Sequence, residues 1–306
     1  MNHERLVFIN GEMVPESRAT VSLFDIGRLY GAAFYESIRT FRHTLFHLTE
    51  HYARLKASLR YAGILDMLDF NRVEEAIIKT LEANIDLTHE DDDMWICVEV
   101  TPGTGFPMPL KKGNKSTPTV FAYSSELPHA DYVRYYAEGK PAVTSIFRNI
   151  PSQSFEQRCK NRARLPHYLS KLYCQGIDPD AFALMLDTNG FVTEGTGANI
   201  FFVSNGKLFT PTMRNILNGI SRLYTIELAK NAGIEVIEKD IGLYEAYNAE
   251  EAFWTTTSYC ILPIRTIDGR RIGGGKPGKT TLSLLSAWSE SVGVDIVGQA
   301  KLFSRV

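Results

Sequence analysis

The sequence has little that would place it among secreted, membrane or nucleic-acid-binding proteins. Its four cysteines form no CxxC pair and no regular framework, which favours reduced thiols in a cytosolic protein. No stretch reaches the roughly 18 apolar residues that a membrane span needs, and the first residues hold no apolar core of signal-peptide length. With a formal net charge of −2, the chain has no electrostatic footprint for nucleic acid or an anionic membrane. The cysteines are Cys97, Cys159, Cys174 and Cys260.

Repeats and low-complexity tracts are absent too, and the 306 residues suit two globular domains. In the N-terminal part, the alternation of FYESIRTF predicts a strand at 34–41 that begins a hairpin. The apolar spacing of 49–63 predicts a helix that Thr49 can cap and Gly63 can end. A second helix is predicted at 71–85 and a further strand at 94–101.

Strand patterns dominate the rest of the chain. We expect a boundary near Ser124–His129, where polar residues and a proline cluster, with an interdomain loop at about 124–131. This gives a small N-terminal α+β domain at 1–125 and a larger C-terminal domain at 126–306, in which helices pack on a mostly β core. The predicted strands are 141–147, 181–187, 198–203, 207–210, 234–240 and 252–257, and the predicted helices include 166–175 and 219–231.

The most regular motif is misleading. GGGKPGKT (273–280) fits the pattern of a phosphate-binding loop, which works only between a buried strand and a helix of a nucleotide-binding unit. Here the polar hairpin pattern RTIDGRRI precedes it, too little chain follows it, and Pro277 removes one N–H group. Nucleotide binding therefore stays a remote alternative, and a glycine-rich turn is expected instead.

The three histidines at a spacing of four do not predict a metal site. His43, His47 and His51 could share a metal only on one helix, and the pattern puts them on two strands and a helix start. We expect ordinary histidines and no metal.

A cluster of cations precedes a predicted helix in RCKNRARLPHY (158–168). Locally, a solvated charge run explains it as well as one reactive lysine with cations that hold an anion. The cations are Arg158, Lys160, Arg162 and Arg164.

Three weaker signals lie further along the chain. In LNGISR, we expect Asn218 to cap a helix whose first residues, Gly219 to Ser221, offer N–H groups to an anion. Glu194 is a lone acid between a hairpin strand and a Gly/Thr-rich turn, where a buried carboxylate needs a partner. FWTTTSYC (253–260) ends a strand with hydroxyls that can contact a phosphate or simply satisfy a loop.

Together these signals match the needs of one cofactor. Pyridoxal phosphate requires a lysine for its Schiff base, an acid at its pyridine nitrogen, and a phosphate site made from a helix N-terminus, hydroxyls and an arginine. A lysine near cations loses its proton more readily.

The sequence resembles the fold-type IV pyridoxal-phosphate enzymes over nearly its whole length, from about Phe8 to about Trp288. This family includes branched-chain and D-amino-acid aminotransferases, (R)-amine transaminases and aminodeoxychorismate lyase. The matching pieces are YGAAFYESIRTF (30–41), LFHLTEHYARLKAS (45–58), Lys160, DTNGFVTEGTGANIFFV (187–203), LNGISR (217–222) and EEAFWTTTS (250–258).

The resemblance implies roles at the matching positions. Lys160 would carry the cofactor and move the proton, and Glu194 would keep the pyridine nitrogen protonated. Arg54 would pair with the phosphate. The other residues implied to bind the cofactor are Leu217, Gly219, Ile220, Ser221, Thr256 and Thr257. Those implied to line the substrate pocket are Tyr30, Arg39, Glu99 and Ser258.

Departures from the family pattern concern the substrate. Where branched-chain enzymes carry an arginine in the strand CVEV, this chain has Glu99, and the loop PMP (107–109) lacks the arginine and histidine of D-amino-acid enzymes. We expect Glu99, if its side chain faces the pocket, to disfavour acidic donors such as glutamate relative to apolar amino acids or amines. Pairing with Arg39, or with one of Lys111 and Lys112, is the alternative that would cancel this effect.

The resemblance therefore implies a cytosolic, homodimeric, pyridoxal-phosphate-dependent aminotransferase. It would move an amino group between a branched-chain-like amino acid and a 2-oxo acid, both small molecules. A D-amino acid or an (R)-amine is the alternative donor, and an aminodeoxychorismate-type lyase is the alternative reaction.

Overall fold

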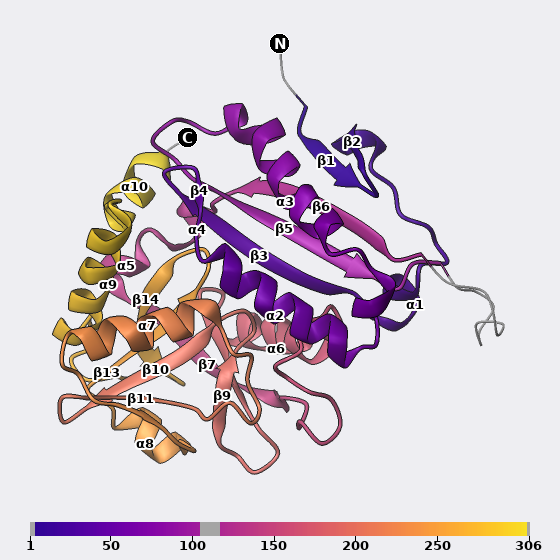
Figure 1. The fold of residues 1–306 in the computed structure, drawn as a ribbon. Helices are drawn as coiled ribbons and strands as arrows, with labels where there is room; N and C mark the ends of the chain where they lie inside the picture. The colour runs from indigo at the N-terminus through magenta and orange to yellow at the C-terminus, as the bar shows by residue number, and fades with distance from the viewer. Residues whose placement is uncertain (1–3, 105–116, 305–306) are drawn as a thin grey trace. The chain divides into compact units, whose positions relative to one another are not determined.

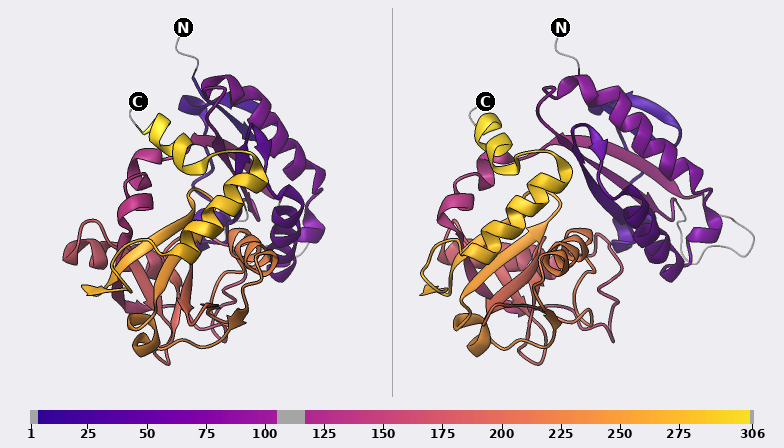
Figure 2. Two further views of the ribbon diagram at one scale, coloured as in Figure 1. Left: turned by 90° about the vertical axis from the view of Figure 1, so that its left-hand side faces the viewer. Right: turned by 60° about the vertical axis from the view of Figure 1, so that its left-hand side comes forward.

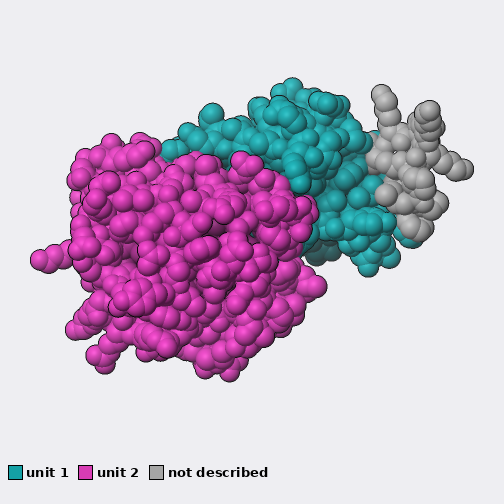
Figure 3. Space-filling model, turned by 90° about the horizontal axis from the view of Figure 1, so that it is seen from below, with its two compact units in different colours: residues 1–127, 159–164 teal, residues 128–158, 165–306 magenta. Residues whose placement is uncertain are grey.

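The computed structural model describes residues 4–104 and 117–304. The chain divides into two compact units, coloured separately in Figure 3: unit 1 comprises residues 1–127 and 159–164, and unit 2 comprises residues 128–158 and 165–306. The division into domains at 1–125 and 126–306 stays a prediction. The units differ from it because the segment that contains Lys160 packs with the N-terminal part of the chain.

Unit 1 is built on an antiparallel sheet with the strand order β2-β1-β6-β5-β3-β4 (Figure 1). Its strands are β1 (Leu6–Ile9), β2 (Glu12–Pro15), β3 (Phe34–Phe41), β4 (Thr44–Leu45), β5 (Met94–Thr101) and β6 (Thr119–Glu126). Its helices are α1 (Ile26–Tyr30), α2 (Leu48–Tyr61) and α3 (Asn71–Asn84), with short 3-10 turns at Glu16–Arg18, Leu65–Met67 and Ile85–Leu87. The predicted strands at 34–41 and 94–101 are confirmed as β3 and β5.

The two long helices of unit 1 cover one face of this sheet. Leu55 and Leu59 of α2 and Ile77 of α3 lie in one apolar cluster with Ile38 of β3 and Val98 of β5. Successive side chains of a strand point to opposite faces. The residues of β3 at 34, 36 and 38 therefore face the helices, and those at 35, 37 and 39 lie on the other face.

The start of α2 differs from the prediction. The helix begins at Leu48, and its cap is His47 in the left-handed conformation, with φ of 51°. Because this residue turns the chain from β4 directly into the helix, Thr49 lies inside the first turn and does not cap it. His43 lies in the turn between β3 and β4, and His51 lies within α2.

Unit 2 contains a mixed sheet with the order β12-β11-β10-β13-β14-β7-β8-β9, and β15 pairs with β14. The strands are β7 (Lys140–Arg148), β8 (Phe182–Leu186), β9 (Val192–Gly195), β10 (Asn199–Ser204), β11 (Lys207–Thr210), β12 (Val236–Glu238), β13 (Glu251–Thr256), β14 (Cys260–Ile267) and β15 (Arg270–Arg271). The helices are α4 (His129–Tyr132), α5 (Tyr135–Glu138), α6 (Leu165–Ile177), α7 (Ile220–Asn231), α8 (Leu243–Tyr247), α9 (Lys279–Val292) and α10 (Ile296–Phe303). Figure 2 shows α9 leading into α10.

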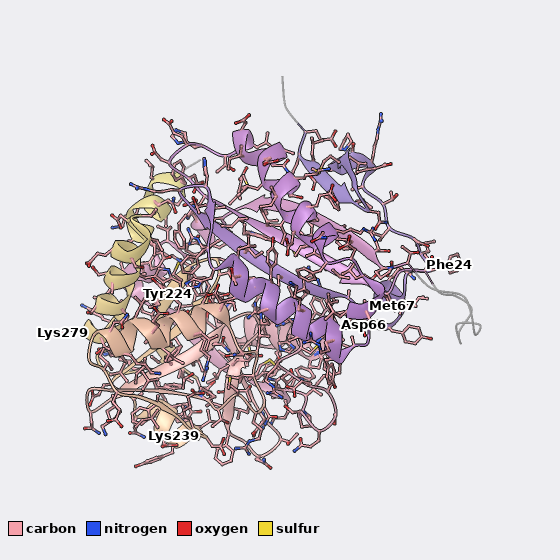
Figure 4. The ribbon with its side chains drawn as sticks, in the orientation of Figure 1. Phe24, Asp66, Met67, Tyr224, Lys239 and Lys279 are labelled. Carbon is pink, nitrogen blue, oxygen red and sulfur yellow. The ribbon has the colours of Figure 1, made fainter. Side chains whose placement is uncertain are left out.

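Aromatic side chains hold the core of unit 2. Phe201 of β10 stacks on Phe253 of β13 with the two ring centroids 5.2 Å apart. Helices α7 and α9 pack on each other through Tyr224, labelled in Figure 4, whose ring meets Trp288 edge-on at 5.0 Å. Within the described part of the chain, no helix combines the length and apolar character needed to cross a bilayer.

Candidate active site

The segment that contains Lys160 is fastened to β3 and α2 of unit 1. The carbonyl oxygen of Lys160 accepts a hydrogen bond from the N–H of Tyr35 at 3.2 Å, and the N–H of Arg162 donates to Ala33 at 2.9 Å. The hydroxyl of Ser58 accepts from the N–H of Lys160 at 3.3 Å and donates to the carbonyl of Arg54 at 3.0 Å. These bonds fix the backbone of Lys160, so the position of its amine depends on few side-chain torsions.

The amine of Lys160 lies in a setting that favours its neutral form. Its Nζ atom lies 4.7 Å from the centroid of the Tyr35 ring. Burial lowers the pKa of Lys160, and the positive charges of Arg54 and Arg164 lower it further against the opposing effects of Tyr35 and Glu36. The predicted direction is therefore confirmed, but burial is the largest cause, and the arginines only add to it. A lysine with a lowered pKa is a better nucleophile and base near neutral pH.

Arg54 is held by a buried acid that the sequence analysis missed. Its Nε and Nη2 atoms donate to the two carboxylate oxygens of Glu36 at 2.7 and 2.6 Å. Nδ1 of His51 lies 2.7 Å from the same carboxylate. Burial alone would raise the pKa of Glu36, but Arg54 and His51 lower it to about 2. Because burial also lowers the pKa of His51, a neutral imidazole donates to an ionised Glu36.

Glu99 pairs with a residue other than those predicted. Its carboxylate accepts from Nε of Arg162 at 2.6 Å, whereas the acid that faces Arg39 is Asp93, at 3.9 Å. The alternative that Arg39 pairs with Glu99 is therefore wrong, and the poor use of acidic donors stays a prediction. The physical reason is the register of the strands: Tyr35 is the cross-strand neighbour of Glu99, whereas Arg39 lies opposite Trp95, four residues along β5 from Glu99. Arg162 lies over Tyr35 and so reaches Glu99. Lys111, Lys112 and the PMP loop at 107–109 lie outside the described residues.

Tyr30 and Arg39 have contrasting surroundings in unit 1. Tyr30 ends α1 and is exposed. Arg39 is buried, donates from Nε to the carbonyl of Thr40 at 3.1 Å, and lies over the ring of Phe41 at 3.9 Å. Their contact with a substrate stays a prediction.

In unit 2, neutral groups hold the carboxylate of Glu194. The residue is buried near the end of β9, and its Oε2 accepts from Nδ2 of Asn199 at 3.1 Å and from the N–H of Leu217 at 3.0 Å. Its Oε1 lies 4.0 Å from Nε2 of His167. No arginine or lysine of the described residues forms a salt bridge with Glu194. An amide and a backbone N–H thus orient the carboxylate, with no arginine or lysine of the described residues paired to it.

The N-terminus of α7 differs by one residue from the prediction. The cap is Gly219 and the helix begins at Ile220, so Asn218 is not the cap. A Cβ at position 219 would lie 2.1 Å from Oδ1 of Asn199, so only glycine fits there. Because a glycine cap has no side chain to accept from the first turn, the N–H groups of Ile220 and Ser221 remain suited to an anion.

The hydroxyl-rich turn after β13 lies beside the same helix. The hydroxyl of Thr225 donates to the carbonyl of Ser221 at 2.8 Å and lies 3.3 Å from the hydroxyl of Thr255. Thr256 donates to the carbonyl of Gly197 at 2.8 Å. The hydroxyl of Tyr132 in α4 donates a hydrogen bond to the carbonyl of Ser258 at 3.4 Å. Helix α7 therefore lies beside β13, the strand that leads into the predicted residues at 256–258.

The N-terminus of α9 is already filled by the protein itself. Glu251 accepts hydrogen bonds from the N–H groups of Thr280 and Thr281 at 3.0 and 2.8 Å, and from the hydroxyl of Thr281 at 2.7 Å. A Cβ on Gly278 would lie 2.0 Å from this carboxylate. The glycines of GGGKPGKT, which includes the Lys279 labelled in Figure 4, therefore admit an internal acid and leave no cradle for a nucleotide phosphate.

Residues that orient the predicted ones were missed by the sequence analysis. Glu36 was readable as an acid on the helix-facing side of an apolar strand, which requires a partner. Arg162 was noted only as one cation of the cluster at 158–168, and Asn199 gave no signal, because their partners lie far away in the sequence or across a turn. Among residues 4–104 and 117–304, no group of three or more His, Cys, Asp or Glu is placed to hold a metal ion.

The sequence model described as Amino-transferase class IV matches residues 33–267, which is more than half of the chain. The chain belongs to the class IV aminotransferases. Several relatives of this aminotransferase match along nearly all of its length. A protein of Methanocaldococcus jannaschii, provisionally named as a branched-chain-amino-acid aminotransferase, is 36% identical, with 91% of this chain and 93% of the relative covered.

Two further relatives and a solved structure support the assignment. The D-alanine aminotransferase of Bacillus licheniformis is 30% identical, covering 94% of this chain and 96% of that protein. The aminodeoxychorismate lyase of Bacillus subtilis is 28% identical, covering 94% of each. A branched-chain amino acid aminotransferase from T.th., solved with pyridoxamine 5'-phosphate, has a TM-score of 0.84 at 25% identity and covers 97% of this chain and 95% of that one. The aminotransferase thus has the fold of the fold-type IV enzymes, and its cofactor is pyridoxal phosphate.

Proposed function

We propose that Lys160 and Glu194 carry the chemistry of this aminotransferase, which passes an amino group from a branched-chain-like amino acid to a 2-oxo acid. The observation that carries the proposal is the contrast in charge between these residues. Lys160 has a lowered pKa, whereas the carboxylate of Glu194 accepts hydrogen bonds from neutral donors. A neutral amine and an anion are what a Schiff-base lysine and the partner of a pyridinium require.

The residues of both units fit the cofactor. In unit 2, the bare cap at Gly219 leaves the first turn of α7 to a phosphate. Thr257 follows β13, the strand whose Thr255 hydroxyl lies beside Thr225 of α7. In unit 1, the guanidinium of Arg54 is oriented by Glu36, which suits a charge-assisted contact with an anion. Leu217 and Thr256 complete the proposed set, since one donates to Glu194 and the other fixes the turn at Gly197.

When bound, pyridoxal phosphate supplies a carbonyl carbon that joins the amino group and a ring that withdraws electrons from it. Nζ of Lys160 takes the proton from the α-carbon of the substrate and returns it later in the turnover. Glu194 holds a proton on the ring nitrogen by its charge. Asn199 and the N–H of Leu217 keep that carboxylate from rotating.

Assembly and location belong to the same proposal. We take the enzyme to be a homodimer of the cytoplasm, as its family resemblance implies. The four cysteines, all buried and none in a disulfide bond, agree with a reducing compartment.

Steady-state kinetics test the reaction type. Leucine with 2-oxoglutarate should give parallel lines in double-reciprocal plots, the pattern of a ping-pong transfer. D-alanine and (R)-1-phenylethylamine, assayed with the same acceptor, rank the alternative donors. Release of pyruvate from aminodeoxychorismate without an acceptor would instead indicate the lyase and overturn the transfer.

A further inference from the structure

Arg162 shares one aromatic ring with the reacting lysine. The two residues lie on the same side of an extended segment, because Asn161 between them pairs with Phe34 of β3. Nζ of Lys160 lies 4.7 Å from the centroid of the Tyr35 ring, and Cζ of Arg162 lies 3.7 Å from it. The guanidinium is therefore placed within unit 1 close to the amine that would react.

Among the described residues, hydrogen bonds are made by only one edge of this guanidinium. Nε donates to Glu99 at 2.6 Å, and Nη2 contacts Sγ of Cys97 at 3.2 Å and the hydroxyl of Tyr123 at 3.4 Å. These three groups lie on the face of the sheet that bears Tyr35, since Tyr35 pairs with Glu99 and Cys97 pairs with Tyr123. Nη1 has no hydrogen-bond partner among residues 4–104 and 117–304, and the side chain is 37% exposed.

The face around Arg162 stays positive although Glu99 is present. Burial alone would raise the pKa of the Tyr35 phenol, but the charges of Lys160, Arg164 and Arg162 outweigh burial and lower it. Arg162 and Arg164 keep their charges even when Lys160 is neutral. An anion at this face would thus be attracted, while Glu99 fixes the orientation of the guanidinium. The carboxylate is mostly covered, which makes the pair geometrically firm.

Every amino acid and 2-oxo acid that an aminotransferase handles has a carboxylate beside the reacting carbon. We infer that Arg162 binds this substrate carboxylate through its free edge, and that Glu99 is its positioning residue. The inference rests on the proposed role of Lys160. It also explains why an acid is tolerated at position 99. The cation that binds the carboxylate is Arg162 in the segment that contains Lys160, and Glu99 on the strand only orients it.

Binding of an unreactive acid tests this role directly. Hexanoate and its neutral amide, hexanamide, are titrated into the holoenzyme, with the cofactor absorbance as readout. Arg162→Gln should weaken hexanoate binding about 10- to 100-fold, the loss expected for one charge-assisted contact, and change hexanamide binding less than about threefold. Arg162→Lys should weaken hexanoate binding less than Arg162→Gln does. Arg158→Gln is the matched control, because Arg158 is exposed and pairs with Glu156.

Two results would overturn the inference. Unchanged hexanoate binding in Arg162→Gln would show that the carboxylate lies elsewhere, and equal losses for hexanoate and hexanamide would show a packing role. Borohydride trapping of the cofactor on Lys160 in the same variant separates the two claims. If Lys160 is labelled but hexanoate binding is unchanged, only the role of Arg162 is refuted. If Lys160 is not labelled in the wild type, the proposed function is refuted and this inference with it.

Discussion

Lys160 in unit 1 lies among charged side chains, whereas Glu194 in unit 2 is held by neutral ones. Around Lys160, two of the fixed positive charges have an opposite partner: Arg54 pairs with Glu36, and Arg162 pairs with Glu99. Around Glu194, an amide and a backbone N–H donate instead. The difference agrees with the role that we propose for each group.

A lysine that has to lose its proton benefits from burial and from cations whose positions are fixed. An acid that has to stay ionised and act on a ligand benefits from donors that add no charge, because a salt bridge would neutralise it within the protein. The four predictions below remove one element of this arrangement at a time.

The largest effect is expected at Lys160. Lys160→Ala removes both the covalent attachment and the base, so kcat should fall by at least about a thousandfold. The cofactor should still bind without a covalent bond, because the proposed phosphate contacts lie on other residues. Absorbance after gel filtration measures retention, and transamination assays measure the rate. Near-normal turnover would contradict the assignment.

A smaller loss is expected when the charge of Glu194 is removed. Glu194→Gln keeps the size of the side chain and should lower kcat about 100- to 1,000-fold, the scale of one preorganised charge. Cofactor affinity, measured by equilibrium dialysis, should change less than kcat. Glu251→Gln is the matched control, since that acid also accepts from neutral donors but lies at α9, and it should lower stability without changing kcat.

Neutralising Glu36 should act on Arg54 and on acid stability. The folded pKa of Glu36, about 2, lies below its usual 4.5. This acid therefore stabilises the fold above pH 4.5, by up to about 3 kcal/mol, and the gain is lost as pH falls toward 2. Glu36→Gln should flatten the acid-unfolding curve in that window and weaken cofactor binding about tenfold.

Urea unfolding followed between pH 5 and pH 2 measures the effect of Glu36. Glu75→Gln is the control, because Glu75 pairs with Lys79 on the surface. An identical pH dependence in Glu36→Gln and in wild type would mean that Arg54 is oriented by other groups.

Lys140 gives the smallest effect and sharpens the comparison, because it is a buried cation of unit 2 held by aromatic rings. Its Nζ lies 3.8 Å from the ring centroid of Tyr135 and 4.5 Å from that of Phe182, on a cavity of about 600 Å³. Burial lowers its pKa from 10.5 to about 8, against the opposing charge of Asp180. The charged form is thus disfavoured in the folded state, and stability should rise as pH increases from 8 to 10.5.

Replacing Lys140 should remove this pH dependence. Lys140→Met should stabilise the protein at pH 7 by about 1–3 kcal/mol and abolish the rise above pH 8. Lys207→Met, at a surface pair with Glu235, is the control. Thermal unfolding from pH 7 to pH 10.5 measures both, and a less stable Lys140→Met at pH 7 would show that the rings hold the cation favourably.

The sequence predicts those features that depend on local periodicity. The alternation of 34–41 and the apolar spacing of 71–85 give β3 and α3 within one residue, because each pattern reports one buried face. The caps are missed at His47 and Gly219. In both, the chain turns through a backbone conformation that tertiary contacts select, which no side-chain preference for capping reveals.

Site chemistry was predictable where the residue types were distinctive, and not where pairing was involved. Lys160, Glu194 and the glycine before α7 follow from the needs of one cofactor. The partner of Glu99 could not be predicted in this way, because Arg162 reaches Glu99 only when the segment that contains Arg162 pairs with β3. The same limitation hid Glu36, whose partners lie on α2.

Borohydride reduction of the purified enzyme tests the central claim most directly. The protein should be yellow before treatment, and reduction should fix the cofactor to one peptide, with the added mass on Lys160 by peptide mapping. Lys160→Ala, treated in the same way, should carry no label. A label on another lysine, or no label on a yellow wild-type protein, would contradict the account.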